Sequence, residues 1–295
     1  MTPSASARIV AEVVRAVPLS PGMVRLTLHG ESLRDYPSTR VGDEYVRVHF
    51  PPEGGELVLP EVDEDGEWHY PDGQYPHIQP YTLRRFDPES AEVDIDFVLH
   101  GHGRAGSWAA RAVPGDRLLF GAPRSLYEAP GSATRQVFVT DATGLPALGR
   151  LLEQLDPATH AVAVVEIADA SHRIELAGPD RLEVRWVPGR GNGVAPSAIT
   201  EILRGLDLPP DTYVWVAGES GELRHARRHL RHERKLPPAW YDVIGYWRHR
   251  QEEWLEKYEA VDAATLAELN ALWERTEDEE LRRDLYEAGL EKLGL

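Results

Sequence analysis

The sequence contains no cysteine among its 295 residues. This absence excludes disulfide bonds, thiolate nucleophiles, zinc–thiolate sites and cysteine-ligated iron–sulfur clusters. The twelve histidines show no H-E-x-x-H motif and no other metal-ligand spacing. Any redox chemistry therefore needs a cofactor that is bound non-covalently, and we predict no metal site in the protein itself.

Long hydrophobic runs are missing as well. No stretch approaches the ~18 consecutive apolar residues that a membrane-spanning helix requires. The first fifteen residues also lack the basic segment and the apolar run of a secretory signal. We therefore expect a cytoplasmic protein with no membrane span.

Positive charge is scarce, because 32 lysines and arginines face 49 acidic residues and the net charge is −17. Proteins that bind nucleic acids normally carry a basic surface, so we expect no nucleic-acid partner. A local basic pocket for an anionic small molecule remains compatible with this composition. The length suggests about two domains of roughly 150 residues each.

The first 130 residues show the two-residue period of β-strands. Apolar and polar side chains alternate over residues 24–28, 46–50 and 93–99, which predicts half-buried antiparallel strands. Several such strands separated by turns are typical of a barrel or a sandwich. The segment 51–80, rich in glycine, proline and acidic residues, predicts a long excursion between strands.

The pattern changes after a cluster of small and turn-forming residues at 127–135. Short apolar strands and amphipathic helices then alternate, which predicts a doubly wound parallel sheet. The predicted strands are 136–140, 161–167, a segment beginning at 185–187, and 213–217; the predicted helices are 146–155, 197–206 and 219–234.

The last 45 residues, 251–295, carry 14 acidic and 5 basic side chains, and large apolar residues recur there at helical spacing. This predicts two or three amphipathic helices that pack on the body or on a second subunit. We therefore predict three units, at residues 1–130, 131–250 and 251–295.

Two segments of the first half carry chemistry. In P-Y-T-L-R at 80–84, the Tyr81 ring can pack on a flavin, and the Thr82 hydroxyl can hydrogen-bond a flavin ring nitrogen. Arg84 can neutralise phosphate charge. Ordinary β packing is the alternative interpretation of this motif.

The second segment, D-F-V-L-H-G-H-G-R-A-G-S-W-A at 96–109, leads from a strand through a glycine-rich turn into a helix. Glycines at 101, 103 and 106 allow backbone amides to approach an anion, and the helix start favours a pyrophosphate. An ordinary loop is the alternative interpretation.

With these motifs the chain resembles the siderophore-interacting proteins, which are FAD-dependent ferric-siderophore reductases related to the ferredoxin reductase superfamily. The resemblance also rests on P-G-D (114–116), T-D-A-T-G-L-P-A (140–147), W-V-A-G-E (215–219) and G-Y-W-R (245–248), in the same order over about residues 8–250. It implies an N-terminal antiparallel β-barrel that binds FAD and a C-terminal α/β domain with a parallel sheet that resembles NAD(P)H-binding domains. The helical tail follows this second domain.

The resemblance also implies site residues, and it implies no catalytic acid or base. Around FAD it places Tyr81, Thr82, Leu83, Arg84, Leu99, His100, Gly101, Gly103, Ala105, Gly106, Ser107 and Trp108. Around the nicotinamide nucleotide it places Asp141, Thr143, Gly144 and Pro146, with Ala217, Gly218 and Glu219 as a second wall. Around an anionic ferric siderophore it places Arg47, Arg248 and Arg250.

Two positions depart from the family pattern. Gln79 stands where the family usually has an arginine two residues before the tyrosine, so the pyrophosphate contact would fall to Arg84 or Arg104. His249 and Arg250 follow G-Y-W-R, where a glycine is common in the family.

The segment 224–235 concentrates six arginines or lysines and three histidines. It is interpreted either as a solvated helix face, with Leu223, Ala226 and Leu230 buried opposite, or as a site for the 2′-phosphate of NADPH or an anionic siderophore. Arg173 and Arg190 are alternative partners for the 2′-phosphate.

The sequence therefore predicts an FAD enzyme that reduces ferric siderophores with electrons from NADPH, NADH or a ferredoxin. One alternative is a general flavin or ferredoxin reductase-like oxidoreductase. The other is a flavin-free siderophore-binding module, which Gln79 motivates. The siderophore, the donor and the oligomeric state stay open at this level.

Overall fold

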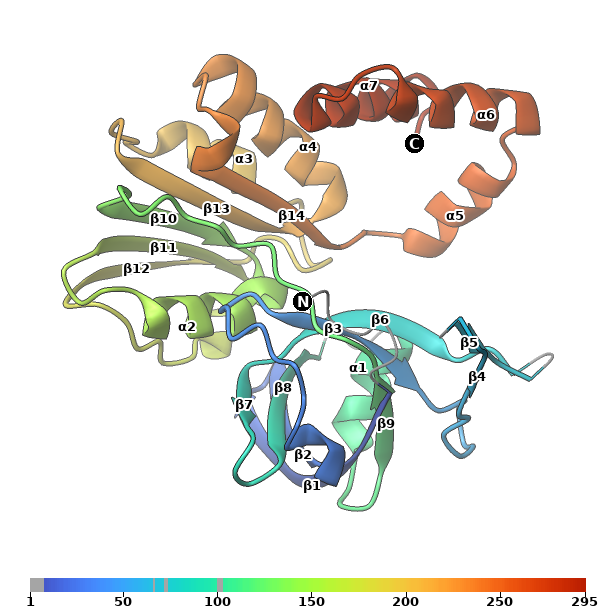
Figure 1. Cartoon of the computed structure of the whole chain (residues 1–295). Helices are drawn as coiled ribbons and strands as arrows, with labels where there is room; N and C mark the ends of the chain where they lie inside the picture. The colour runs from blue at the N-terminus through green and yellow to red at the C-terminus, as the bar shows by residue number, and fades with distance from the viewer. Residues whose placement is uncertain (1–7, 66, 72–73, 100–102) are drawn as a thin grey trace.

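The computed structural model describes residues 8–65, 67–71, 74–99 and 103–295, and it contains an antiparallel sheet, a parallel sheet and a helical C-terminal segment (Figure 1). The antiparallel sheet has seven strands in the order β6-β3-β9-β1-β2-β8-β7. These strands are β1 (Ile9–Ser20), β2 (Met23–His29), β3 (Tyr45–Phe50), β6 (His77–Thr82), β7 (Arg85–Asp87), β8 (Glu92–Val98) and β9 (Arg117–Phe120). Between β3 and β6, the predicted excursion holds a short hairpin of β4 (Glu61–Val62) and β5 (Trp68–His69).

The antiparallel sheet curls into a barrel because its two edge strands are neighbours in the chain. Strand β6 ends at Thr82 and β7 begins at Arg85. The two residues between them span at most roughly 11 Å, so the two edges of the sheet must approach each other. This confirms the predicted N-terminal antiparallel barrel.

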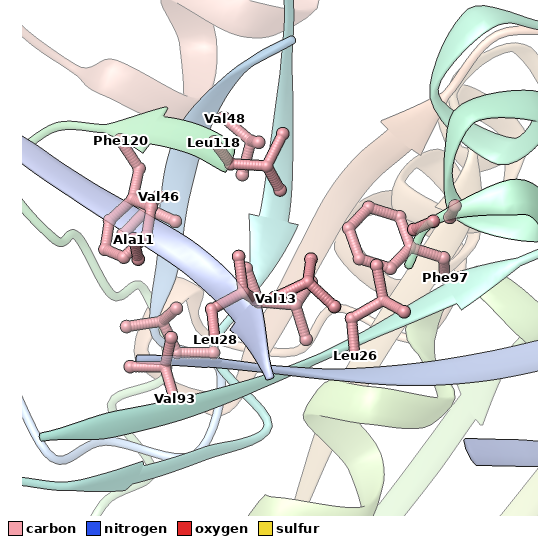
Figure 2. Close-up of a cluster of buried hydrophobic side chains, with 14 of the residues drawn as sticks. Ala11, Val13, Leu26, Leu28, Val46, Val48, Val93, Phe97, Leu118 and Phe120 are labelled. Atoms are coloured by element: carbon pink, nitrogen blue, oxygen red, sulfur yellow. The ribbon is translucent and has the colours of Figure 1, made fainter. Parts of the chain in front are cut away.

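The barrel interior follows the predicted alternation. Val24, Leu26 and Leu28 of β2 are buried, and Val93 and Phe97 of β8 face the same centre. Figure 2 shows these inward side chains converging from five strands. The labelled cluster is Ala11, Val13, Leu26, Leu28, Val46, Val48, Val93, Phe97, Leu118 and Phe120.

The outer face of β2 and β8 is also covered, which the alternation does not predict. Asp94 and Asp96 are buried. Arg25 binds Asp96 at 2.6 Å, and the Thr27 hydroxyl donates to Asp94 at 2.7 Å. Paired charges are the usual way in which carboxylates become buried.

The parallel sheet has the strand order β12-β11-β10-β13-β14, the order of a doubly wound fold. Helix α2 packs on one face of this sheet, and α3 and α4 pack on the other. The strands are β10 (Arg135–Thr140), β11 (His160–Ile167), β12 (Arg181–Pro188), β13 (Thr212–Glu219) and β14 (Tyr241–Trp247); the helices are α1 (Arg104–Arg111) beside the barrel, α2 (Leu145–Gln154), α3 (Ile199–Gly205) and α4 (Ser220–Arg228).

The two edge strands of the parallel sheet are the elements that the sequence pattern missed or shortened. Strand β12 begins at Arg181, before the predicted segment at 185–187, and β14 was not predicted. Most of their side chains are half-buried or exposed, so neither strand shows the continuous apolar run of a central parallel strand.

The two sheets meet through closely packed segments. A Cβ atom on Gly42 would lie 2.7 Å from the Cα atom of Leu151 in α2, so only glycine allows this approach. Met23 of the barrel packs into the core of the parallel-sheet domain. The Asp43 carboxylate accepts hydrogen bonds from the backbone amides of Leu126 and Tyr127 at 3.1 and 2.8 Å.

We expect Asp43→Asn to be more stable than the wild type above about pH 6 and equal to it near pH 4. Burial raises the pKa of Asp43 from 3.8 to about 6. Because the folded state then binds the proton more tightly than the unfolded state, the stability that this group provides is lost as the pH rises through about 6. The difference between variant and wild type should reach about 2–3 kcal/mol.

Urea unfolding of both proteins at pH 4.5 and pH 7.5 measures this difference. The exposed Asp35→Asn is the matched control. A stability gap between Asp43→Asn and the wild type that is the same at both pH values would contradict the prediction.

The tail forms three helices, α5 (Gln251–Glu259), α6 (Ala263–Ala271) and α7 (Glu279–Lys292). Helix α7 lies against α4 and the π-helical turn that follows it, His229–Glu233 (Figure 1). Leu269 of α6 and Leu290 of α7 are the buried apolar residues of the tail helices. This confirms amphipathic helices packed on the body of the same chain. In the part of the chain that is described, no helix combines the length and the apolar character needed to cross a membrane.

The basic segment 224–235 is the surface on which α7 docks. The Arg227 side chain is only 4% exposed and binds Glu280, Asp284 and Glu287. Leu223, Ala226 and Leu230 are buried as predicted, and acidic side chains of α7 cover Arg227 and pair with Arg228 and Arg231. The interpretation as a solvated face is therefore wrong for Arg227, which α7 covers, whereas His225, Arg234 and Lys235 are exposed as that interpretation expects.

Candidate functional site

The end of β6 presents the first group of predicted site residues. The Tyr81 ring packs on Phe97 with centroids 4.5 Å apart and contacts Phe50 at 5.9 Å. Thr82 is buried, and Tyr246 of β14 lies against it. The predicted flavin-facing pair thus stands where the barrel meets the parallel-sheet domain.

The start of α1 supplies a site for phosphate. Gly103 precedes the helix with φ 86° and, as the N-cap residue, brings no capping side chain, and the first turn holds no acidic residue. A Cβ atom on Gly106 would lie 3.1 Å from the carbonyl oxygen of Val98, so glycine permits the close helix–strand packing. Free backbone amides at a helix start favour an anion.

Arg104 is the cation that the structure places near the position of Gln79. His77 lies two residues before Gln79 on β6, and the positive charge of Arg104 lowers the His77 pKa further after burial has lowered it. Arg84 is instead paired with Glu153 of α2 and packs on Gly149. Of the two substitutes for the family arginine, Arg104 therefore stands on the side of the predicted pyrophosphate site.

These features fit the cofactor that the first domain implies. An uncapped helix start, a neighbouring guanidinium and an aromatic ring at a strand end match the phosphate and ring systems of FAD. The remaining predicted residues of this group are Leu83, Ala105 and Trp108, which are buried, Leu99, which is half-buried, and Ser107, which is exposed. His100 and Gly101 lie outside the described residues.

The turn after β10 forms the second half of the site. Asp141 is buried and accepts hydrogen bonds from the Thr143 backbone amide at 2.8 Å and from the Trp247 indole at 2.6 Å. Burial raises the Asp141 pKa. The Ala142 amide donates to the Asn192 side chain at 3.0 Å. Sequence analysis missed Trp247 as a partner of Asp141, and it missed Asn192 altogether.

Gly218 closes this turn from β13. Its φ of 154° lies in the region that favours glycine, and a Cβ atom there would lie 2.9 Å from the Asp141 carboxylate. Glu219 caps α4 by accepting from the Glu222 amide at 2.8 Å. The predicted second wall, Ala217 to Glu219, is therefore in contact with the predicted nucleotide turn.

A cavity of about 490 Å³ opens at this carboxyl edge, beside the switch point between β10 and β13. Ligands of doubly wound sheets bind at such a switch point. The glycine-rich segment 191–197 and the start of α4 form its walls, together with Trp247 and His249. The described lining holds two glutamates, Glu219 and Glu222.

Among the described residues, no contact brings the three predicted substrate arginines together. The Arg248 guanidinium lies over the Trp254 ring of α5, 4.4 Å from its centroid. Arg250 is exposed and lies 3.6 Å from Glu253. Arg47 is exposed on β3. The contact between Arg248 and the tail is a feature that the local sequence did not indicate.

The two sheets together form the fold of the ferredoxin reductases. An antiparallel barrel is followed in the chain by a doubly wound parallel sheet. Ferredoxin–NADP⁺ reductase from Plasmodium falciparum shares this arrangement with a TM-score of 0.56 over 81% of this chain and 96% of its own, at 10% identity. That likeness establishes the fold.

The chain belongs to the siderophore-interacting protein family. A siderophore-interacting FAD-binding domain matches residues 12–127, and a siderophore-interacting protein domain matches residues 133–250. The NADPH-dependent ferric-chelate reductase of Escherichia coli is 31% identical over 240 residues, covering 80% of this chain and 91% of that protein. A siderophore utilization protein from T. fusca has a TM-score of 0.72 at 34% identity, covering 82% of this chain and 93% of its own.

A third relative is named for its substrate. The ferric vibriobactin reductase ViuB of Vibrio cholerae is 26% identical over 249 residues, covering 82% of this chain and 90% of its own length. These relatives match across both sheets, so the family assignment rests on the whole body of the molecule.

Proposed function

We propose that this protein reduces ferric siderophores in the cytoplasm, using FAD and electrons from NADPH or NADH, with a ferredoxin as the alternative donor. The observation that supports this most directly is the meeting of the two half-sites. Thr82 on the barrel lies against Tyr246, and the neighbouring Trp247 is bonded to Asp141 of the nucleotide turn. We keep the division into residues 1–130, 131–250 and 251–295 as part of this proposal.

Each half-site residue has a role that follows from its surroundings. The start of α1 and Arg104 would hold the pyrophosphate, the Tyr81 ring would pack on the flavin, and the Thr82 hydroxyl would hydrogen-bond a ring nitrogen. Asp141 orients Trp247 and the turn that receives the nicotinamide nucleotide. FAD held by these residues would supply the conversion of one two-electron donor, the dihydronicotinamide, into two one-electron reductions of Fe(III) to Fe(II).

The substrate side needs charge and orientation, and no acid–base group. A ferric siderophore is commonly anionic, and Arg47, Arg248 and Arg250 offer positive charge on a protein whose net charge is −17. Trp254 holds the Arg248 guanidinium in a cation–π contact, which fixes its position. Iron enters with the substrate.

The test begins with the visible spectrum of the purified protein and chromatography of the released cofactor. We expect a flavin spectrum and FAD. The photoreduced protein, mixed anaerobically with an iron(III) siderophore and a ferrous chelator, should be reoxidised while Fe(II) appears in a two-to-one ratio to flavin. Equal turnover with free flavins or quinones and no preference for ferric siderophore would favour a general flavin reductase.

A colourless protein that takes up no added FAD would overturn the proposed function. Tight binding of ferric siderophore by such a protein would identify the flavin-free binding module.

A further inference from the structure

A buried ion pair joins the two sheets close to both half-sites. Arg150 of α2 donates to Glu44, which directly precedes β3, at 2.9 Å. The side chains are 9% and 0% exposed. Glu44 also accepts from the Ser38 hydroxyl at 2.8 Å and the Thr39 amide at 2.6 Å, so its carboxylate is fully engaged.

The same two residues hold the backbone next to Thr82. Arg150 donates to the Leu83 carbonyl at 2.6 Å, and the Leu83 amide donates to the Glu44 carbonyl at 2.9 Å. Leu83 follows Thr82 directly and is fully buried. The flavin-facing end of β6 is therefore fixed from both sides by one pair.

Helix α2 carries this connection to the nucleotide turn. The helix begins at Leu145, immediately after the turn that starts at Asp141. Arg150 lies five residues into the helix, about 8 Å along its axis. A helix is rigid over such a length. Helix α2 therefore holds the nucleotide turn at a fixed position relative to the end of β6.

A buried ion pair is weak evidence for stability, because desolvation offsets the attraction between the charges. Its effect on geometry is more specific, because two charges and the Leu83 carbonyl must all align. Gly42, two residues before Glu44, contacts Leu151 of the same helix, so the backbone beside the pair is packed closely against α2.

We propose that Glu44 and Arg150 are positioning residues that set the distance and angle between the nucleotide turn and the flavin-facing end of β6. This inference rests on the proposed function. The step that depends on it is the transfer of one hydride from dihydronicotinamide to the flavin, which oxidises the nucleotide and reduces the flavin by two electrons. Misplacement of reacting groups by about 1 Å can slow such a step up to a hundredfold.

The test uses the double variant Glu44→Gln/Arg150→Met, which removes both charges and leaves neither buried alone. In anaerobic stopped-flow, bleaching of the bound flavin by NADH or NADPH should slow about tenfold, with a changed deuterium isotope effect. The FAD dissociation constant and the reoxidation of photoreduced enzyme by an iron(III) siderophore should stay within about twofold. Gln154→Ala, which removes an exposed hydrogen bond from α2 to the Arg40 carbonyl, is the matched control.

A second measurement, made without cofactor, tests whether the ion pair couples the two sheets. In calorimetry of the FAD-free protein, the double variant should unfold the two sheets in separate transitions, whereas the wild type unfolds in one. Unchanged bleaching in a folded double variant, or an equal loss in both half-reactions, would overturn the inference. If neither nucleotide bleaches the wild type, the inference fails while iron reduction by photoreduced enzyme still tests the proposed function.

Discussion

Arg227→Met is expected to release the C-terminal helices from the body of the protein. The Arg227 guanidinium is buried between α4 and α7 and binds Asp284 at 2.6 Å and Glu280 at 3.2 Å. Its removal leaves Arg231 as the arginine that still pairs with both acids, at 2.8 Å from Asp284 and 3.4 Å from Glu280. Breaking a buried pair typically costs about 3–5 kcal/mol, and because Arg231 keeps part of the pairing we expect a loss at the lower end of this range.

Hydrogen exchange of the α7 amides measures this release. In the variant, exchange across residues 279–292 should accelerate by about a hundredfold or more, while β10 and β13 stay protected. Arg228→Met is the matched control, because Arg228 is 50% exposed and pairs with Glu291; a surface pair contributes at most about 1 kcal/mol. Unchanged α7 protection in Arg227→Met would show that apolar packing holds the tail.

Tyr81→Ala is expected to have the largest effect on the flavin half-site. The ring contacts Phe97 and Phe50 and also forms the surface on which we place the flavin. Truncation of an aromatic side chain that packs on the core should reduce the free energy of unfolding by about 3 kcal/mol. The loss of stacking area should weaken FAD binding by about 2 kcal/mol, roughly thirtyfold.

Urea unfolding and flavin fluorescence titration measure the two effects of Tyr81→Ala separately. Tyr81→Phe is the control, because it keeps the ring and its contacts and removes only the hydroxyl. It should bind FAD within about twofold of the wild type. FAD binding as tight in Tyr81→Ala as in Tyr81→Phe would place the flavin elsewhere.

The sequence predicts correctly those strands that are buried on one face or on both faces. The alternation over 93–99 places Val93 and Phe97 in the barrel core because a strand repeats every two residues. The apolar run 161–167 becomes the second strand of the parallel sheet because both its faces are covered. Strand β14 escaped prediction, and β12 was predicted too short, because edge strands lack this signature.

Contacts between distant segments could not be predicted from local patterns. Asp141 and Trp247 are 106 residues apart in the chain, and only the sheet order brings their strand ends together. The partner of Arg227 lies on α7, 57 residues further on. A cluster of cations alone does not show whether acids of the same chain will cover it, so a ligand site and a docking surface look alike in sequence.

The edge strand β12 has a consequence for assembly. It carries Arg181, Glu183 and Arg185 at alternate, exposed positions, and Arg185 binds Glu183 at 2.7 Å. An open edge is a template on which another chain can add a strand, and charged side chains along it oppose such growth. The barrel has closed its own edges through Leu83 and Arg84, and the parallel sheet protects its β12 edge with charge. Copies of this protein that associate are therefore expected to do so through helices or loops, without extending the sheet at β12.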